Sequence, residues 1–480
     1  MVTDTAPDTS RARALTGWGR TAPTVAHVHE PASVDDVVGV LRESPHRRRR
    51  GVLARGLGRS YGDAATAAGQ DVLDTRRLTG WDLDETTGVA AVAAGTSLDV
   101  LLRDIVPRGW FVPVTPGTRY VSIGGAIAAD VHGKNHHRDG AIGSHLEWVD
   151  LVDGTGRLRR LAPTGPDADL FWATVGGLGL TGVITAAAVR LRRIESAWIS
   201  VSTQRCPDLA ALMAGLRAHD ARHRYSVAWI DVLAGGRGVI TSGDHAGADA
   251  VAASGVLDVR DVRDYHPAPR LVVPQMPVGV VSTLTARAFN EVWYRKAPAL
   301  REGELQRLET FFHPLDGVRE WNRLYGPRGF VQYQFVVPDD RDDVVASAMD
   351  ALAGARVPAF LAVLKRFGPG DAAPLSFPRP GWTLAMDVPA AGRERLARVL
   401  DGLDEEVADA GGAVYLAKDA RCRPELVPVM YPRLEEWRRA RDRLDPERRM
   451  ASDLSRRLRL IDSNRPTDRG AAGSITGGER

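Results

Sequence analysis

The most informative segment of this sequence is residues 52–63, which read Val52-Leu53-Ala54-Arg55-Gly56-Leu57-Gly58-Arg59-Ser60-Tyr61-Gly62-Asp63. The apolar residues at its start predict a short strand, and the glycines predict a tight turn directly after that strand. Turns of this kind bring backbone N–H groups close to a phosphate. The segment therefore predicts a phosphate-cradling loop.

A second segment of small residues has the same character. It begins at Pro116-Gly117-Thr118, includes residues 122–130 (SIGGAIAAD) and continues to His132-Gly133-Lys134. Two phosphate-cradling segments in one domain indicate a dinucleotide. A third glycine cluster, 176–182, contains GxGxxG, but a helical pattern precedes it and a β pattern follows it. That order is the reverse of a nicotinamide-binding unit, so the third cluster does not predict NAD binding.

Length and composition limit the class of protein. With 480 residues, 44% of them hydrophobic and 26% charged, the chain is long enough for two or three globular domains. A formal net charge of +3 is too balanced for a dedicated nucleic-acid binder. Two cysteines, Cys206 and Cys422, exclude a zinc knuckle or a disulfide framework. Because no secretory leader or apolar span is visible, we expect a protein that is cytoplasmic or peripheral at the membrane.

Lysine is scarce in this chain. Four of the 63 basic residues are lysines (Lys134, Lys296, Lys365 and Lys418), and the others are arginines. A lysine persists against such a bias most readily where a compact amine that can lose its proton is needed. The alternative is that the four are ordinary solvated surface residues. Neighbouring histidines His136 and His137 are expected to be solvated.

The pattern of apolar residues divides the chain. Residues 1–195 form a first domain, in which Ser97 caps a helix with its apolar face at Leu98, Leu101, Leu102 and Ile105. Residues 196–412 form a second domain of alternating strands and helices, although 234–290 is poor in regular pattern. Residues 330–337 alternate as a strand that places Gln332 and Gln334 on one face. Residues 463–480 are expected to be disordered.

The first glycine turn resembles that of the vanillyl-alcohol oxidase/p-cresol methylhydroxylase superfamily of FAD-binding proteins. Longer runs, from about residue 13 to 462, resemble the members that act on decaprenylphosphoryl-β-D-ribose. These runs are residues 15–23, 124–137, 171–182, 293–296, 313–316, 320–322, 332–335 and 418–419. The implied fold is α+β: a two-part FAD-binding domain, completed by residues 413–462, and an inserted α+β substrate domain with an antiparallel sheet. Residues 415–417 are expected to be a strand that carries Lys418 into the site.

The resemblance implies FAD as cofactor, and it identifies the contacts position by position. The cofactor contacts are Ala54, Arg55, Gly56, Leu57, Gly58, Arg59, Ser60, Tyr61, Gly62, Asp63, Ala64, Gly117, Ser122, Ile123, Gly124, Gly125, Ala129, Asp130, Val131, His132, Ile184 and Tyr415. Relatives that oxidise soluble sugars commonly tether FAD through a histidine in the first turn. Arg59 occupies that position here, so we expect non-covalent FAD.

The resemblance also implies the substrate site and the reaction. The substrate contacts are Lys134, Lys365, Gln334, Gln332, Trp229, Tyr61 and Ala385. We expect the ribose 2′-hydroxyl of a polyprenyl-phosphate sugar to be oxidised to a ketone, with Lys418 as base and His132 assisting. Lys134 and Lys365 are expected to bind the phosphate. Three positions depart from the relatives: Ala385 replaces a cysteine of the mycobacterial proteins, Thr383 an asparagine and Phe312 a tyrosine.

Two other hypotheses remain open at this point. One is an FAD-dependent oxidase of a soluble sugar, alditol or aldonolactone, and the other is a non-catalytic flavoprotein or nucleic-acid binder. As partners we expect a separate NAD-dependent keto-reductase and a membrane surface contacted through Arg47–Arg50 or 234–290, and no nucleic acid. The sequence leaves open the electron acceptor, the polyprenyl length, the oligomeric state, the membrane face and the division of roles among the lysines.

Overall fold

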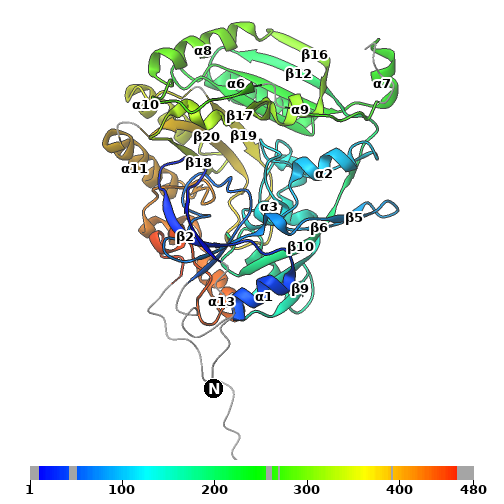
Figure 1. Cartoon of the computed structure of the whole chain (residues 1–480). Coiled ribbons are helices and arrows are strands. Elements are labelled where there is room, and N and C mark those ends of the chain that lie inside the picture. Colours follow the sequence, from blue (N-terminus) through cyan, green and yellow to red (C-terminus); the bar gives the residue numbers. More distant parts are fainter. Residues whose placement is uncertain are drawn as a thin grey trace, which may run out of the picture.

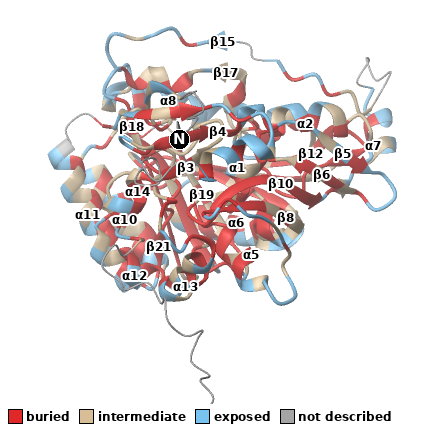
Figure 2. Ribbon diagram, turned by 60° about the horizontal axis from the view of Figure 1, so that its bottom comes forward, coloured by how far each residue is buried: buried red, intermediate tan, exposed pale blue. Residues whose placement is uncertain are grey.

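The computed structural model describes residues 10–42, 51–255, 262–268, 271–359, 361–390 and 393–461 (Figure 1). Both the arginine run 47–50 and the tail 463–480 lie outside the described residues. Helices and mostly antiparallel sheets make up the described chain, which confirms the α+β class. Burial is concentrated in the sheets and in the inner faces of the helices that cover them (Figure 2).

The N-terminal half of the described chain builds two sheets. The four-stranded sheet has the order β1-β2-β4-β3, with β4 parallel to both of its neighbours, and the five-stranded antiparallel sheet has the order β5-β6-β10-β8-β9. Their strands are β1 Arg11–Leu15, β2 Thr24–His29, β3 Val52–Arg55, β4 Asp71–Asp74, β5 Trp81–Asp84, β6 Val89–Ala93, β8 Leu146–Asp153, β9 Leu158–Leu161 and β10 Gly182–Arg190. A small ladder joins β7 (Trp110–Phe111) to β11 (Arg192–Arg193).

Short helices cover these two sheets. Helix α2 begins after its cap Ser97 and buries Leu98, Leu101, Leu102 and Ile105, as the spacing predicts. The α-helices of this half are α1 Val34–Arg42, α2 Leu98–Ile105, α3 Ile123–Ala128, α4 His136–Asp139 and α5 Ala168–Thr174, with 3₁₀ turns at Thr75–Arg77 and Ile142–His145. The third glycine cluster connects α5 to β10, so the predicted helix-to-strand order is confirmed.

A large sheet dominates the middle of the chain. Among the described residues it has eight strands in the order β16-β12-β14-β13-β19-β20-β18-β21. They are β12 Trp198–Cys206, β13 Tyr225–Ile230, β14 Gly238–His245, β16 Leu300–Arg307, β18 Phe330–Val337, β19 Ala362–Phe367, β20 Gly381–Pro389 and β21 Ala413–Val414. A separate ladder pairs β15 (Leu271–Val272) with β17 (Val318–Arg319). The region 234–290 therefore holds more regular structure than the sequence pattern indicates, because β14 lies inside it.

Helices α6, α10 and α11 pack against one face of this sheet, which leaves the opposite face for the N-terminal half (Figure 1). The helices of the region are α6 Leu209–Arg222, α7 Ala248–Ala253, α8 Thr283–Lys296, α9 Leu308–Phe312, α10 Asp342–Gly354 and α11 Arg393–Asp409, with 3₁₀ turns at Pro314–Gly317 and Trp321–Tyr325. Across the described residues, no helix is both long and apolar enough to cross a membrane.

The C-terminal segment returns to the first half of the molecule. Strand β21 still belongs to the eight-stranded sheet, since Val414 pairs with Phe335 of β18. Beyond it, the carbonyl of Ala417 accepts a hydrogen bond from the amide of Tyr61 (3.3 Å), and Met450 forms a parallel bridge with Val52. This segment contains α12 Val427–Met430, α13 Leu434–Leu444, α14 Asp453–Arg457 and the 3₁₀ turn Pro424–Leu426.

The predicted strand over residues 415–417 is wrong. The strand ends at Val414, and the amides of Lys418 and Asp419 both donate to the carbonyl of Tyr415 at 3.0 Å. These two bonds close a turn. Lys418 therefore enters the site from a turn at the edge of the large sheet.

Candidate active site

The side chain of Arg55 supports the first glycine loop through hydrogen bonds to neighbouring carbonyl groups. The guanidinium of Arg55 donates to the carbonyl oxygens of Ala65 (2.6 Å) and Thr16 (2.8 Å). Gly58 has φ +64°, in the left-handed region that glycine adopts without strain. Within the described chain, no protein acceptor receives the backbone N–H groups of residues 57–60. The loop therefore offers successive amide donors, as a phosphate site requires.

The second glycine segment lies against the first. Ser122 caps helix α3, and its Oγ accepts the amide of Gly125 at 3.3 Å. A Cβ atom added to Gly56 would lie 2.0 Å from that same Oγ, and one added to Gly124 would lie 2.9 Å from the Cβ of Ala94. Glycine at position 56 thus lets the two segments meet, and glycine at position 124 lets the second segment pack close to Ala94. The juxtaposition of the two segments fits the pyrophosphate of a dinucleotide cofactor such as FAD.

The other predicted cofactor residues surround this junction. The hydroxyl of Tyr415 donates to the carbonyl of Ala129 at 2.6 Å, which ties the turn after β21 to α3. Ile184 is buried on β10, and Gly117 has open space beside its Cα atom. At these positions, backbone atoms and the Tyr415 ring can contact a cofactor bound between the two glycine segments.

Two of the predicted cofactor residues use their carboxylates on protein partners. Asp63 binds the guanidinium of Arg457 at 2.7 and 2.9 Å. Asp130 accepts hydrogen bonds from Ser376 Oγ (2.5 Å) and the amide of Gly143 (3.1 Å).

The register of the eight-stranded sheet aligns the predicted substrate residues. Side chains of directly opposed residues share a face of a sheet. One row across four strands consists of Trp229, Val363, Ala385 and Gln334. In the flanking rows Lys365 lies opposite Thr383, and Gln332 lies opposite Asp387. The predicted residues of this set come together on the face that looks toward the N-terminal half.

His132 reaches this face from the segment after α3. Its Nδ1 lies 3.2 Å from Lys365 Nζ, and its Nε2 lies 3.2 Å from the amide nitrogen of Gln334. A neutral imidazole accepts at one ring nitrogen and donates at the other. In this arrangement the Gln334 amide donates to Nε2, so Nδ1–H donates to Lys365. Burial, then the charges of Lys365 and Lys418, hold the pKa of His132 well below its usual range, which keeps the ring neutral.

The three predicted lysines of the site are buried and have lowered pKa values. Burial lowers the pKa of Lys134 to about 7, and its amine donates to the carbonyl of Phe311 while lying 4.2 Å from the centroid of the Phe311 ring. Burial and the charges of Lys418 and Lys134 lower the pKa of Lys365 to about 7. Both amines can therefore be neutral near physiological pH, as the hydrogen bond from His132 to Lys365 requires.

Lys418 lies between two aromatic rings and is electrostatically paired with a buried carboxyl group. Its Nζ is 5.6 Å from the ring centroid of Tyr61 and 5.9 Å from that of Tyr415. Burial lowers the pKa of Lys418 to about 8, against the opposing effect of Asp387. Burial also raises the pKa of Asp387 to about 7, and this carboxyl accepts a hydrogen bond from Gln332 Nε2 at 2.5 Å.

Two acceptor oxygens on this face are buried and unused. In the described part of the chain, Oε1 of Gln332 and Oε1 of Gln334 have no hydrogen-bond partner. A buried acceptor without a partner is energetically costly. Hydroxyl groups of a bound sugar would donate hydrogen bonds to these two oxygens. This pair of free acceptors thus fits a polyhydroxylated substrate.

Sequence reasoning missed Asp387 and misjudged His136. Asp387 follows Thr383 and Ala385 at a spacing of two in an otherwise apolar strand, a signal that would have placed it on the same face. His136 is 1% exposed, and its ring packs 4.5 Å from that of Phe367, so the expectation of a solvated ring is wrong. His137 is also mostly buried, with Nε2 3.0 Å from a backbone carbonyl. Helix α4 begins here and packs against β19, which buries both rings.

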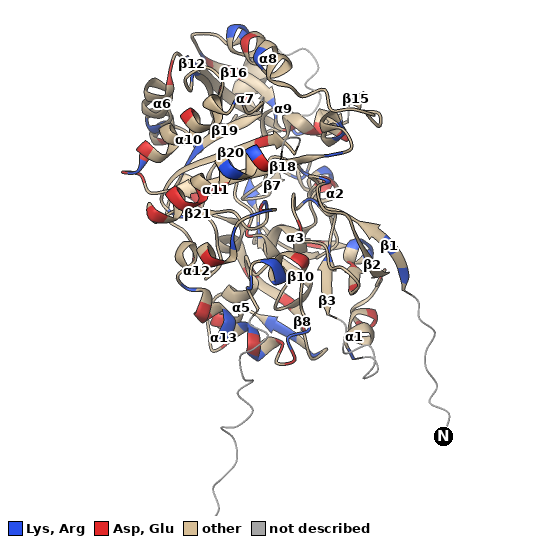
Figure 3. Ribbon diagram, turned by 90° about the vertical axis from the view of Figure 1, so that its left-hand side faces the viewer, with Lys and Arg blue, Asp and Glu red and all other residues tan. Residues whose placement is uncertain are grey.

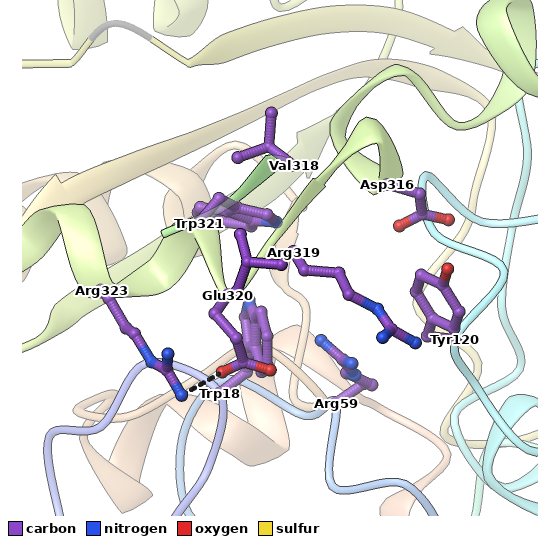
Figure 4. Close-up of a pocket in the computed structure, with 10 residues that line it drawn as sticks. Trp18, Arg59, Tyr120, Asp316, Val318, Arg319, Glu320, Trp321 and Arg323 are labelled. Atoms are coloured by element: carbon purple, nitrogen blue, oxygen red, sulfur yellow. Dashed lines mark ion pairs between the residues drawn. The ribbon is translucent and has the colours of Figure 1, made fainter. Parts of the chain in front are cut away.

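A cavity of about 270 Å³ lies beside the first glycine loop (Figure 4). The guanidinium of Arg59 projects into it and stacks 3.8 Å from the ring centroid of Trp18. Its opposite wall comes from residues 316–323, where Glu320 pairs with Arg323 at 3.5 Å. Arg59 Nε is buried without a hydrogen-bond partner among the described residues. At the position where relatives tether FAD through a histidine, this chain thus has an arginine whose guanidinium stacks on Trp18.

Comparisons with known proteins agree with this geometry. A family model described as an FAD binding domain matches residues 25–162. Decaprenylphosphoryl-beta-D-ribose oxidase of Mycolicibacterium smegmatis is 41% identical over 454 residues, which cover 93% of this chain and 97% of that protein. An uncharacterized protein in the mprA 5′ region of Streptomyces coelicolor is 40% identical over 377 residues, covering 76% and 100% of the two chains. Cytokinin dehydrogenase 2 of Arabidopsis thaliana is 26% identical over 166 residues, 34% of this chain and 32% of its own.

The apposed glycine segments and the matching domain define the class: this chain is an FAD-binding oxidoreductase. The likeness to the mycobacterial enzyme continues through the eight-stranded sheet and the C-terminal return. The chain belongs to the decaprenylphosphoryl-beta-D-ribose oxidase family. The predicted family and the predicted FAD cofactor are confirmed.

Proposed function

We propose that this protein oxidises the ribose 2′-hydroxyl of a polyprenylphosphoryl-β-D-ribose to the 2′-ketone. The observation that carries the proposal is the pair of buried amines of Lys365 and Lys418 beside neutral His132, with the buried amine of Lys134 close enough to Lys365 to lower its pKa. The name of the mycobacterial relative supports the same substrate. A site of this kind combines a base with two cations, which an alcohol attached to a phosphate requires.

The FAD would be held by the amides of residues 57–60, the start of α3 and the ring of Tyr415. When bound, it supplies the redox chemistry by accepting a hydride from the carbon that carries the hydroxyl. The protein holds it without a covalent bond, because Arg59 provides no nucleophile at the tethering position.

Lys418 is the base of the reaction. An amine with a pKa of about 8 is partly unprotonated at neutral pH and can accept the hydroxyl proton. His132 orients the sugar through its links to Gln334 and Lys365. The carbonyl oxygens of Gln332 and Gln334 accept hydrogen bonds from the other hydroxyl groups.

Lys134 and Lys365 bind the substrate phosphate. The pKa values of about 7 apply to these two amines before the phosphate binds. A phosphate that enters the buried site favours the protonated amines, because an opposite charge within a few ångströms raises the pKa of a lysine. Substrate binding therefore takes up protons at these two positions.

Anaerobic mixing tests the proposal. The holoenzyme is mixed with a short-chain polyprenylphosphoryl-β-D-ribose, and the loss of visible flavin absorbance is followed. We expect rapid bleaching with this compound and none with a free alditol or ribose 5-phosphate. Bleaching by the alditol, with no response to the lipid-linked sugar, would instead identify an oxidase of soluble sugars.

The 2′-keto product is consumed by a separate NAD-dependent reductase. The third glycine cluster connects a helix to a strand and so lacks the strand-to-helix order of a nicotinamide site. With the keto product present, NADH should be stable in the presence of this protein alone. If this protein oxidised NADH without a second enzyme, the proposal of a separate reductase would be wrong.

A further inference from the structure

Helix α8 buries a polar residue and exposes several large apolar ones. Of its described side chains, Ala286 and Asn290 are buried, whereas Leu284 is 78% exposed and Val292 is 69% exposed. Phe289 and Trp293 are 46% and 45% exposed, and their rings stack at 6.0 Å with an angle of 12°. An amphipathic helix of a globular protein ordinarily has the opposite orientation.

The chain around α8 carries most of the exposed large apolar side chains. In Figures 1 and 3, α8 lies at the end opposite α1 and α13. Nine of the thirteen such side chains in the described residues fall between 271 and 300. They are Leu271, Val272, Val278, Val280, Leu284, Phe289, Val292, Trp293 and Leu300, here called the 271–300 surface. Such a concentration marks an interaction surface.

Polar contacts hold α8 in this orientation. Asn290 Nδ2 donates to Asp231 Oδ1 at 2.7 Å, and Arg237 pairs with Glu291 at 2.7 Å. The guanidinium of Arg237 also lies 4.5 Å from the ring centroid of Tyr294. The polar face of the helix is thus anchored to the turn after β13, which fixes the apolar face outward.

The charges of this segment indicate an anionic partner. Residues 283–301 contain four basic residues, Arg287, Arg295, Lys296 and Arg301, and one acidic residue, Glu291. Glu291 is paired with Arg237 and Arg295, and Arg301 is paired with Glu304 of the same strand, which leaves Arg287 and Lys296 without a carboxylate partner among the ion pairs of the described residues. We propose that the 271–300 surface docks on an anionic lipid membrane. Exposed apolar side chains enter the interface, aromatic rings suit its depth, and basic residues are attracted to anionic head groups.

A second copy of the chain is the weaker candidate. A two-fold symmetric contact would bring the same patch against itself and place the basic residues of one copy near those of the other. An anionic lipid surface neutralises them instead. The proposal rests on the proposed function in one respect, since a polyprenyl-linked substrate must be drawn from a membrane.

The 271–300 surface also borders the cavity beside the first glycine loop. Val272 is 55% exposed and lines that cavity together with Arg59, Arg319 and Arg323. Strand β15, which contains Val272, pairs with β17 on the cavity wall. Docking would therefore place this cavity, which is lined by three arginines and two carboxylates, next to the lipid head groups.

Vesicle co-sedimentation of the FAD-loaded protein tests the surface. The probes are vesicles of phosphatidylglycerol with phosphatidylcholine and vesicles of phosphatidylcholine alone. We expect the parent to sediment with the anionic vesicles and high salt to weaken this binding. Phe289→Ser/Trp293→Ser should partition at least about tenfold less, because two large side chains no longer leave water. Arg295→Glu/Lys296→Glu should lose the preference for anionic vesicles.

The matched control is Leu158→Ser, which removes an apolar side chain with 51% exposure on a distant strand. It should bind vesicles like the parent. Equal binding by the parent and by Phe289→Ser/Trp293→Ser would overturn the proposal. So would a parent that dimerises through these residues and ignores vesicles, as measured by sedimentation equilibrium.

Flavin reduction by a short-chain substrate separates this proposal from the proposed function. Phe289→Ser/Trp293→Ser should keep the parent's rate with that substrate, because neither residue belongs to the active site. If the protein binds vesicles but no polyprenylphosphoryl-ribose reduces its flavin, the docking surface stands and the proposed function falls. If the protein oxidises the substrate but ignores vesicles, the proposed function stands and the docking surface falls.

Discussion

The amine of Lys365 lies 3.2 Å from Nδ1 of His132, although 233 residues separate them in the chain. His132 comes from the FAD-binding half and Lys365 from the substrate sheet. Their contact joins the two halves at the site of reaction. Because His132 stays neutral and accepts from Gln334 at its other nitrogen, it donates to Lys365 and stabilises that amine in its neutral form.

Lys418→Arg should lose turnover and keep its FAD. Arginine preserves the positive charge, but its pKa is too high for it to act as a base at neutral pH. We expect single-turnover flavin reduction to slow by at least about 100-fold, the typical effect of a lost general base. Stopped-flow absorbance measures the rate. Lys296→Arg, at an exposed lysine of α8, is the matched control and should react like the parent; a rate within a few-fold of the parent in Lys418→Arg would move the base assignment to His132.

The rate of flavin reduction should rise with pH and level off above about pH 8. Lys418, with a pKa of about 8, acts in its unprotonated form, so each pH unit below that value costs about tenfold in rate. Asp387 raises this pKa, so Asp387→Asn should move the midpoint to lower pH while its amide oxygen still accepts from Gln332. Single-turnover rates over a pH series measure both profiles.

The control for this series is Asp404→Asn. Asp404 is a buried carboxyl group that accepts from the Tyr333 hydroxyl on the opposite face of the sheet. The pH midpoint of flavin reduction in Asp404→Asn should equal that of the parent. An unchanged midpoint in Asp387→Asn would mean that the titrating base is a different group.

Gly56→Ala should empty the cofactor site. The added methyl group would lie 2.0 Å from Ser122 Oγ and force the two glycine segments apart. Overpacking of this kind costs about 1–3 kcal/mol of stability. The flavin-to-protein absorbance ratio of the purified protein and its thermal midpoint give the two readouts.

Gly56→Ala/Ser122→Gly should recover part of the FAD. Removing the serine side chain clears the clash, and glycine at a helix N-cap costs only a few tenths of a kcal/mol. Gly39→Ala, in α1 with no atom within 4 Å of the added Cβ, is the control and should retain FAD. Full flavin content in Gly56→Ala would show that the segments do not meet as described.

Acid precipitation should release the flavin completely. Arg59 stands at the tethering position, and both free cysteines, Cys206 and Cys422, are buried outside the glycine segments. Intact-mass analysis should give the mass of the polypeptide alone, and the yellow colour should remain in the supernatant. A peptide that carries the mass of FAD would refute non-covalent binding.

Much of the local structure could be predicted from the sequence by itself. Glycine spacing specifies the loop after β3, because Gly56 must approach Ser122, Gly62 must approach the backbone of Asp419, and Gly58 adopts a left-handed turn that bulky residues resist. Apolar spacing specifies α2, and alternation specifies the shared face of Gln332 and Gln334. These features depend on neighbours in the chain, so a sequence pattern carries them.

Only the tertiary structure decided which distant groups meet. The register between β18 and β20 puts Asp387 beside Gln332, and the turn after Val414 brings Lys418 within the electrostatic influence of that carboxyl group. The polar anchor at Asp231 turns the apolar face of α8 outward. Contacts between residues hundreds of positions apart depend on how whole elements pack, and burial then sets the pKa values, so no local pattern encodes them.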